Sequence, residues 1–199
     1  MTTLEIIFDQ KNIIWYGKFS TAEIAKMEVS KSMSSDSLLK DKVILVVDDE
    51  PDVLEAIADE LDMCIIHKAR DYNTALQSIT MYTYDVVILD IMGVNGFELL
   101  RKSVQRGFPA LMLTAHALTP EALKKSIKLG AVSFLPKEKI ADLVYFLEQV
   151  VLEEGKPIWR KLFNRFGGYF NQRFGPDWKE KDKFFEEFEE SVIGKSKPE

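Results

Sequence analysis

Short apolar runs alternate along the middle of the chain with longer segments whose apolar positions recur every three or four residues. The runs are rich in β-branched side chains and mostly lack the polar alternation of a half-exposed strand, as is typical of buried parallel strands. They lie at 43–47, 63–67, 86–89, 110–113 and 132–135. The segments of helical period lie at 51–61, 73–81, 97–106, 120–129 and 140–152. This alternation predicts a doubly wound α/β fold with five parallel strands and helices on both faces.

Two of the predicted helices carry clear start signals. Pro51 and Pro120 suit first-turn positions, where a missing backbone N–H costs nothing, and Thr119 offers an N-cap hydroxyl before Pro120. In a sheet wound in this way, the reactive centre belongs at the carboxyl ends of the strands.

The first forty residues follow a different pattern. LEIIF and IIWYGKF are separated by residues 9–12, which predicts a hairpin with a four-residue turn. Ser20 and Glu23 form a capping box for a short helix at 20–30, and the serine-rich stretch 30–37 is typical of a linker. We therefore divide the chain into an N-terminal extension (1–40), an α/β domain (41–154) and a helical C-terminal extension (155–199).

The C-terminal extension contains two segments with aromatic residues at helical spacing. The first is interrupted by glycines at 167 and 168, which give the chain a place to fold back, and its stripe consists of Trp159, Leu162, Phe163, Phe166 and Phe170. The second sets acidic residues opposite an apolar face of Trp178, Phe185, Phe188 and Val192. Exposed aromatics in such numbers favour association, so we expect the extension to pack helix on helix, on its own domain or on a second copy.

Composition narrows the class of protein. Of the 199 residues 46% are hydrophobic, enough for a packed core, and the formal net charge of −6 argues against attraction of the whole chain to nucleic acid. The single cysteine, Cys64, lies in an apolar run and is interpreted as a core residue in a reducing, cytoplasmic setting. A signal peptide and an apolar run of roughly 20 residues are both lacking, which predicts a soluble protein.

Polar residues stand at the ends of four predicted strands. Asp48 and Asp49 follow the first strand, Asp90 the third, Thr114 the fourth and Lys137 the fifth. Parallel strands bring these side chains to the same edge of the sheet. Carboxylates crowded there repel one another, and a bound cation would offset the repulsion.

These residues, in this order over 42–153, resemble the receiver domain of two-component response regulators. The resemblance implies a CheY-like, flavodoxin-like sheet with strand order 2-1-3-4-5. It also implies that Asp90 is the phosphoacceptor, whose carboxylate attacks the phosphorus of a phosphohistidine on a sensor histidine kinase or a histidine phosphotransfer protein. Such a protein is a phosphorylation-controlled switch that promotes its own phosphorylation and dephosphorylation, and not an enzyme in the ordinary sense.

The same resemblance implies a metal site. Mg²⁺, or Mn²⁺ in its place, would be bound by Asp49, Asp90 and the backbone carbonyl of Met92, with Asp48 acting through a water. Hard oxygen ligands with several waters retained suit that ion.

The remaining implied roles concern the phosphoryl group and the switch. Lys137 resembles the lysine that pairs with phosphoryl oxygens, and the small Ala115 lets its backbone amide approach them. Thr114 resembles the switch hydroxyl that moves toward the phosphoryl group, and Phe134 the aromatic that turns inward when it does. A switch of this kind works by biasing an equilibrium between two existing states.

The sequence departs from the family pattern in the loop after Asp90 and in the residue after Lys137. The loop from Asp90 to Gly96 is about two residues shorter than usual and lacks its proline, and Glu138 replaces the proline that usually follows the lysine. At the two positions that often set the lifetime of the aspartyl phosphate stand Met92, which cannot position a water by hydrogen bonding, and His116. His116 either positions a water or is an exposed loop histidine.

Output is expected through contact with a downstream protein, because residues 155–199 show no helix-turn-helix pattern and no motif of an output enzyme. A homodimer through these helices or the last receiver helix is an alternative. So are a DNA-binding or membrane-surface role for the basic residues on the aromatic helix, and a degenerate receiver that only binds partners. The acids at 177–190 work against DNA binding, so neither DNA nor a membrane is the expected partner.

Overall fold

The computed structural model describes residues 38–115 and 118–193. The chain divides into two compact units, Met1–Leu38 and Leu39–Glu199, of which the second contains the α/β domain and the C-terminal helices. The predicted N-terminal hairpin, its helix and the linker at 30–37 lie outside the described residues, as does His116.

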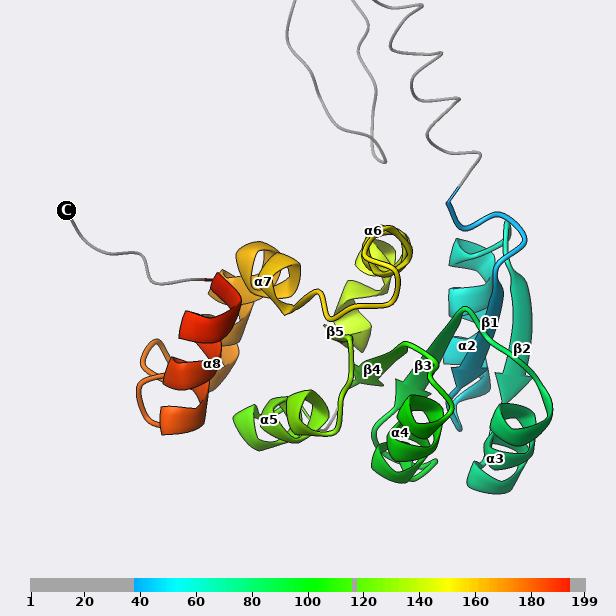
Figure 1. The fold of residues 1–199 in the computed structure, drawn as a ribbon, viewed down its shortest axis with the longest axis horizontal. Coiled ribbons are helices and arrows are strands. Elements are labelled where there is room, and N and C mark those ends of the chain that lie inside the picture. The colour runs from blue at the N-terminus through cyan, green and yellow to red at the C-terminus, as the bar shows by residue number, and fades with distance from the viewer. Residues whose placement is uncertain (1–37, 116–117, 194–199) are drawn as a thin grey trace, which may run out of the picture. The chain divides into compact units, whose positions relative to one another are not determined.

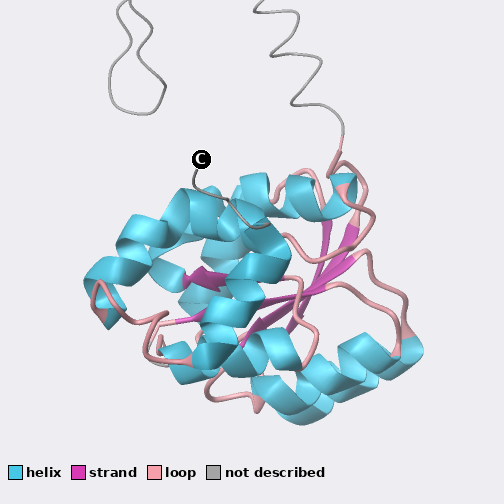
Figure 2. Ribbon diagram, turned by 60° about the vertical axis from the view of Figure 1, so that its left-hand side comes forward, coloured by secondary structure: helices cyan, strands magenta, loops and turns pink. Residues whose placement is uncertain are grey.

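The second unit contains a parallel sheet of five strands in the order β2-β1-β3-β4-β5, so the predicted fold class and strand order are confirmed (Figures 1 and 2). The strands are β1 (Val43–Val47), β2 (Ile65–Ala69), β3 (Val86–Asp90), β4 (Ala110–Thr114) and β5 (Ser133–Pro136). Their carboxyl ends are aligned, with Val47 opposite both Ala69 and Leu89, and Asp90 opposite Leu113. The register therefore brings the residues that follow the strands to one edge.

Helices connect the strands and cover the sheet on both sides, with α3, α4 and α5 on one face and α2 and α6 on the other (Figure 1). They are α2 (Pro51–Glu60), α3 (Tyr72–Met81), α4 (Gly96–Gln105), α5 (Pro120–Lys128) and α6 (Leu143–Leu152). The predicted starts at Pro51 and Pro120 are confirmed, and Thr119 Oγ1 accepts the Ala122 N–H as an N-cap. None of the helices in the described part is long and apolar enough to cross a membrane.

The last helix of the α/β domain begins later than predicted. A 3₁₀ segment, η1 (Lys137–Asp142), follows β5 directly, and α6 starts only at Leu143 instead of residue 140. Lys139 has non-helical φ and ψ angles of −114° and 23°, which kinks the chain within η1.

Strands β1, β3, β4 and β5 form the centre of the core, and almost all of their side chains are buried. The prediction that every strand is buried on both faces is wrong for β2. This strand lies at the edge of the sheet, begins two residues later than predicted, and leaves Ile65 48% exposed. At the other edge of the sheet β5 is buried because α7 (Trp159–Phe174) packs against it, whereas in the described part of the chain no element lies beyond β2, so the side chains of β2 remain partly in solvent (Figure 1).

The C-terminal extension forms two helices, α7 (Trp159–Phe174) and α8 (Lys183–Ile193), beyond β5 (Figure 1). The five residues of the predicted stripe are the buried residues of α7. The predicted interruption at Gly167 and Gly168 is wrong, because α7 continues through both. Glycine in a helix interior costs about 1 kcal/mol relative to alanine, and the buried aromatics on either side of the pair outweigh that cost.

The second apolar face is also arranged differently from the prediction. Trp178 lies in the turns before α8 and not on the helix with Phe185, because Gly175 ends α7 with a φ of +96° and α8 starts only at Lys183. Trp178 and Phe185 still meet, with ring centroids 4.7 Å apart. The aromatic cluster is thus assembled by a turn instead of by helical spacing.

Candidate functional site

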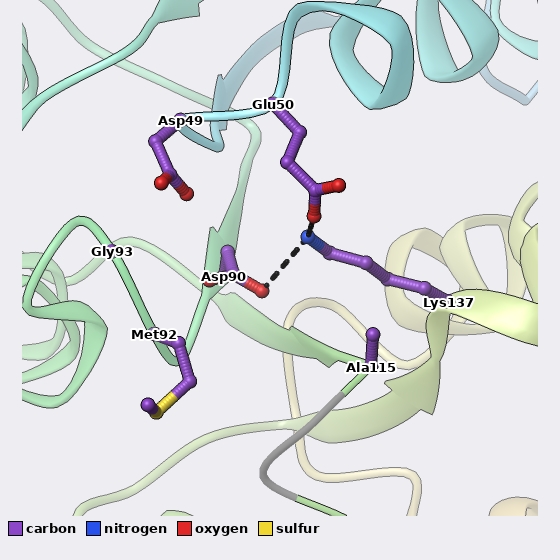
Figure 3. Close-up of a pocket in the computed structure, with 7 residues that line it drawn as sticks. All are labelled: Asp49, Glu50, Asp90, Met92, Gly93, Ala115 and Lys137. Carbon is purple, nitrogen blue, oxygen red and sulfur yellow. Dashed lines mark hydrogen bonds and ion pairs between the residues drawn. The ribbon is translucent and has the colours of Figure 1, made fainter.

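Four strand ends deliver polar side chains to one edge of the sheet, as predicted. Asp48 follows β1, Asp90 and Thr114 are the last residues of β3 and β4, and Lys137 follows β5. Figure 3 shows Lys137 extending from the end of β5 toward the carboxylate of Asp90.

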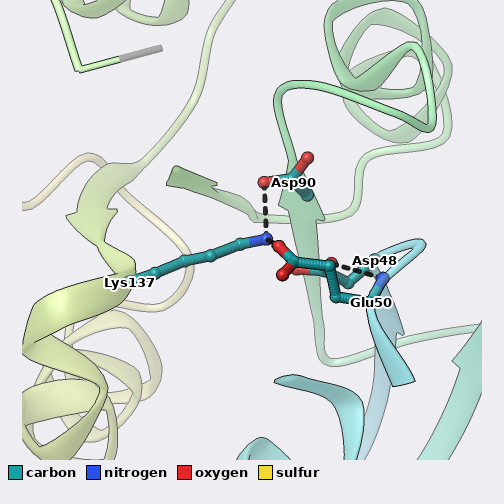
Figure 4. A network of polar contacts seen from close by, with 4 residues as sticks. All are labelled: Asp48, Glu50, Asp90 and Lys137. Atoms are coloured by element: carbon teal, nitrogen blue, oxygen red, sulfur yellow. Dashed lines mark hydrogen bonds and ion pairs between the residues drawn. The ribbon is translucent and has the colours of Figure 1, made fainter. Parts of the chain in front are cut away.

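The ammonium of Lys137 lies among three carboxylates (Figure 4). Its Nζ is 2.7 Å from Asp48 Oδ2, 2.7 Å from Glu50 Oε1 and 3.1 Å from Asp90 Oδ1. The Lys137 side chain is only 10% exposed, so its charge is poorly hydrated and depends on these partners. Burial lowers the pKa of Lys137, but the three acids together raise it above its ordinary value. In this structure the lysine supplies the positive charge that holds the crowded acids together.

Asp48 is fully buried, and its Oδ1 accepts the backbone N–H of Glu50 at 3.0 Å. Burial raises the pKa of Asp48, opposed by its contacts with Lys137 and the Glu50 amide. The side chain belongs to the ion-pair network and does not line the neighbouring cavity. Asp48 therefore takes part in the ion pairs of Lys137 and not in the wall of the cavity.

Asp90 is 3% exposed, and its pKa is raised to about 6. Burial is the main cause, and the charge of Asp48 adds to it, while Lys137 and the Met92 amide act in the opposite direction. A buried carboxylate that stays ionised near neutral pH is a strong nucleophile and a good cation ligand.

A cavity of about 230 Å³ opens beside Asp90 (Figure 3). Seven residues line it: Asp49, Glu50, Asp90, Met92, Gly93, Ala115 and Lys137. Five of them are the predicted Asp49, Asp90, Met92, Ala115 and Lys137, so the cavity unites most of the predicted metal and phosphoryl ligands.

The predicted metal ion can be tested against these donors. Mg²⁺ in proteins is typically held by one or two carboxylates, with waters and phosphate oxygens completing the coordination. Asp49 and Asp90 offer two carboxylates to one cavity. In the described part of the chain no three His, Cys, Asp or Glu side chains are grouped closely enough to hold an ion. The donors therefore fit Mg²⁺ or Mn²⁺ when water and phosphoryl oxygens complete the shell.

Two residues of the cavity were not among the predicted site residues. Glu50 is the third of the consecutive acids, and its ion pair with Lys137 links positions 87 residues apart. Gly93 has a φ of +65° and lies against Asp49. Two features of the sequence could have indicated these residues: the run of three acids that ends at Glu50, and a glycine three residues after Asp90.

The shortened loop after Asp90 has its own geometry. Gly96 lies so close to the backbone carbonyl of Asp90 that a β-carbon there would fall 1.9 Å from the oxygen. Asn95 takes a left-handed conformation just before it. The thioether of Met92 points away from Asp90 (Figure 3), and its backbone carbonyl accepts the N–H of Val94. A carbonyl oxygen has two lone pairs, so this bond leaves one for another partner.

The predicted switch residues lie on β4 and β5. Thr114 is 1% exposed at the end of β4, directly before Ala115, which lines the cavity. Phe134 is fully buried in the middle of β5. The aromatic is thus already inside the protein in this structure.

The model of a protein family described as "Response regulator receiver domain" matches residues 44–148, about half of the chain. Protein-glutamate methylesterase/protein-glutamine glutaminase 2 of Nitratidesulfovibrio vulgaris is 30% identical over 133 residues, which are 61% of this chain and 36% of that protein. The Fimbriae Z protein of Salmonella typhimurium is 30% identical over 122 residues, which are 57% of this chain and 58% of that protein. The matched region thus spans less than two thirds of either relative.

Solved structures show the same fold. A CheY-like response regulator receiver domain protein from Methanospirillum hungatei has a TM-score of 0.53 at 24% identity, covering 58% of this chain and 97% of its own. A putative response regulator from Chloroflexus aurantiacus has a TM-score of 0.51 at 27% identity, covering 57% and 99%. Both likenesses extend over nearly all of the solved chain and over a little more than half of this one. By its sequence and by the fold of its α/β domain, this chain belongs to the response regulator receiver domain family.

Proposed function

We propose that the chain is a phosphorylation-controlled signalling protein that accepts a phosphoryl group on Asp90 in a Mg²⁺-dependent reaction. The donor is a phosphohistidine on a histidine kinase or a histidine phosphotransfer protein, and the output is contact with another protein. The observation that carries the proposal is the position of Asp90, a buried carboxylate at the wall of the cavity, 3.1 Å from the Lys137 ammonium.

These positions support the following reaction. A carboxylate oxygen of Asp90 attacks the phosphorus, a P–O bond forms, and the P–N bond to the donor histidine breaks. The histidine leaves with the electron pair of that bond and takes up a proton, while the phosphoryl group stays on Asp90 as an acyl phosphate. Lys137 lies where its ammonium pairs with a phosphoryl oxygen, and the Ala115 amide lies at the wall of the same cavity.

Asp49 and Asp90, with the Met92 carbonyl, would hold the cation, and Asp48 would reach it through a water. When bound, the ion neutralises the charge that two carboxylates and a phosphoryl group bring together. The positive charge of Lys137 also offsets this negative charge, because its ammonium already contacts Asp48 and Asp90. Thr114 and Phe134 are the proposed switch elements that respond to the phosphoryl group.

The C-terminal helices support output through a protein surface better than DNA binding. Lys161, Arg165 and Arg173, three of the four basic residues of α7, pair with Glu153, Asp142 and Glu138 of the receiver. Basic residues engaged in this way present little free charge to a phosphate backbone. The helix therefore offers no basic face of the kind that nucleic acid requires.

The test is phosphoryl incorporation into the full chain from radiolabelled acetyl phosphate with Mg²⁺. The wild type should be labelled to a stoichiometry near one, and Asp90→Asn should fold and remain unlabelled, because the amide keeps the shape but is not a nucleophile. Asp62→Asn, an exposed acid after α2, serves as the matched control and should be labelled normally. Stoichiometric labelling of Asp90→Asn would refute the assignment, and an unlabelled wild type would indicate a degenerate, partner-binding receiver.

A further inference from the structure

The C-terminal helix α7 docks along α6. Phe166 packs against Phe146 with ring centroids 5.4 Å apart. Lys161 Nζ donates to Gln149 at 2.7 Å and to Glu153 at 2.8 Å. The contact therefore combines an apolar stripe with a polar border, as in a specific helix interface.

The extension also reaches the opposite side of β5. Lys124 of α5 pairs with Asp182 at 2.6 Å, just before α8, and lies 5.2 Å from the ring centre of Phe184. Lys128, one turn further along α5, lies 5.1 Å from the same ring. The two C-terminal helices thus connect α5 with α6 and lie over the β5 edge of the sheet (Figure 1).

The second half of α7 contacts the segment that carries the site lysine. Tyr169 Oη donates to Glu138 Oε2 at 2.7 Å, and Arg173 Nη2 donates to Glu138 Oε1 at 3.0 Å. Lys139 Nζ lies 5.3 Å from the ring centre of Tyr169. Glu138 shares a peptide bond with Lys137, so these contacts hold the backbone next to the site.

The segment η1 depends on contacts with other elements. Besides the bonds of Glu138, Arg165 of α7 pairs with Asp142 at the end of η1. Ile140 packs partly against the core. The segment is a 3₁₀ turn of six residues with a kink at Lys139, and none of its residues is buried. Yet its first residue, Lys137, must place an ammonium among Asp48, Glu50 and Asp90. Short 3₁₀ segments have poor hydrogen-bond geometry, so outside contacts decide where such a segment lies.

We propose that Tyr169 and Arg173 are positioning residues of the phosphoryl site, acting through Glu138 to fix the backbone from which Lys137 reaches Asp90. The phosphorylation part of this inference rests on the proposed function. Because coupling between two binding events is reciprocal, a phosphoryl group that changes the position of Lys137 also changes the docking of α7. The extension is thereby part of the switch and not an appended module.

The contacts of Tyr169 and Arg173 with Glu138 can be removed without unfolding the protein, so substitutions can test the proposal. The side chains of Glu138 and Arg173 are 56% and 48% exposed, so their ion pair adds little to stability. Catalytic geometry is more sensitive, because a small displacement of a reacting or charge-pairing group lowers rates steeply. Removing the two contacts should therefore change the reaction much more than the free energy of unfolding.

The first measurement is the initial rate of labelling from acetyl phosphate with Mg²⁺, in the full chain. The double variant Tyr169→Phe, Arg173→Gln should be labelled roughly tenfold more slowly than the wild type. Arg173→Lys, which keeps a cation for Glu138, should stay close to the wild-type rate. Lys161→Gln is the matched control, because it removes a polar contact of the same helix with α6 and leaves η1 untouched. A double variant with the wild-type rate would overturn the proposal.

The second measurement does not depend on phosphorylation. The ¹⁵N resonance of the Lys137 ammonium, assigned by its absence in Lys137→Met, reports the surroundings of this nitrogen. It should shift in the double variant and not in Lys161→Gln. If the wild type takes up no phosphoryl group but the resonance shifts as expected, the proposed function fails and the positioning role stands. If the resonance is the same in the double variant and the wild type, the positioning role fails.

Discussion

Gly93 lies against the carboxylate of Asp49: a β-carbon on Gly93 would fall 2.2 Å from Asp49 Oδ1 and 2.4 Å from its Cγ. The close approach arises because the short loop after Asp90 turns back at Gly93 with a φ of +65°. The shortened loop thus leaves room for Asp49 only as long as residue 93 has no side chain.

Gly93→Ala is expected to displace Asp49 and weaken Mg²⁺ binding. Asp49 is the flexible end of an exposed side chain, so it moves aside and the fold survives, with a loss of about 1 kcal/mol from the left-handed backbone. Gly107→Ala is the matched control, because its φ is +77° and a β-carbon there meets nothing within 4 Å. Mg²⁺ titrations should give Gly107→Ala the wild-type affinity, and Gly93→Ala an affinity approaching that of Asp49→Ala. If Asp49→Ala and Gly93→Ala both bound Mg²⁺ with the wild-type affinity, residues other than Asp49 would be the ligands of the ion.

Lys137→Met is expected to destabilise the protein. The change leaves Asp48 and Asp90 buried without their cation, and breaking a buried ion pair in this way typically costs about 3 kcal/mol. The measurement is urea unfolding at pH 7 in the absence of divalent ions. Lys156→Met is the control, since the Lys156 side chain is 73% exposed and 3.9 Å from its partner. Equal stability of the two variants would mean that the three acids do not depend on the lysine.

The raised pKa of Asp90 predicts how stability depends on pH. Its folded-state pKa of about 6 lies above its ordinary value of 3.8, so between these values the folded protein binds more protons than the unfolded chain. The stabilisation is complete below pH 4 and is lost as the pH rises through 6. With EDTA present, the unfolding free energy of the wild type minus that of Asp90→Asn should fall by on the order of 2 kcal/mol between pH 4 and pH 7. A difference that is constant over this range would show that Asp90 titrates normally.

Gly168→Ala is expected to stabilise the protein by about 1 kcal/mol, since the glycine lies inside a continuous helix and a β-carbon there meets nothing within 4 Å. Urea unfolding followed by tryptophan fluorescence measures the change, because Trp159 and Trp178 are buried with α7. Gly175→Ala should have the opposite sign, since Gly175 ends the helix with a φ of +96°. If alanine at 168 destabilised the protein, the chain would bend at the glycine pair.

Most of the fold could be predicted because uninterrupted apolar runs mark buried strands and the βα alternation determines how they are wound. The edge strand β2 could not be placed from this pattern. The apolar Met63 and Cys64 precede the strand and resemble its start, whereas His67 and Lys68 within it look like its end. Local composition does not say which strand lies at an edge.

The site residues also fall into some that could be predicted from the sequence and some that could not. Asp90 and Lys137 could be placed beside each other because topology alone carries strand ends to one edge of the sheet. The ion pair of Glu50 with Lys137 depends on side-chain direction across 87 residues, and the contact of Gly93 with Asp49 depends on the path of one short loop. In α7 the intrinsic preference of two glycines suggested a break, and packing of the neighbouring aromatics decided otherwise.

The two edges of the sheet differ in a way that bears on self-assembly. At the β5 edge the backbone N–H of Ile158 donates to the carbonyl of Val132, just before the strand, and the strand itself is buried throughout. At β2, within the described residues, no strand pairs with the outer side, and Ile65 is half exposed. Within the described residues, a sheet that is open at β2 can join one other such edge across a twofold axis, after which the β2 edge of each partner is paired. Strand addition through β2 would therefore stop at pairs and not continue into fibres.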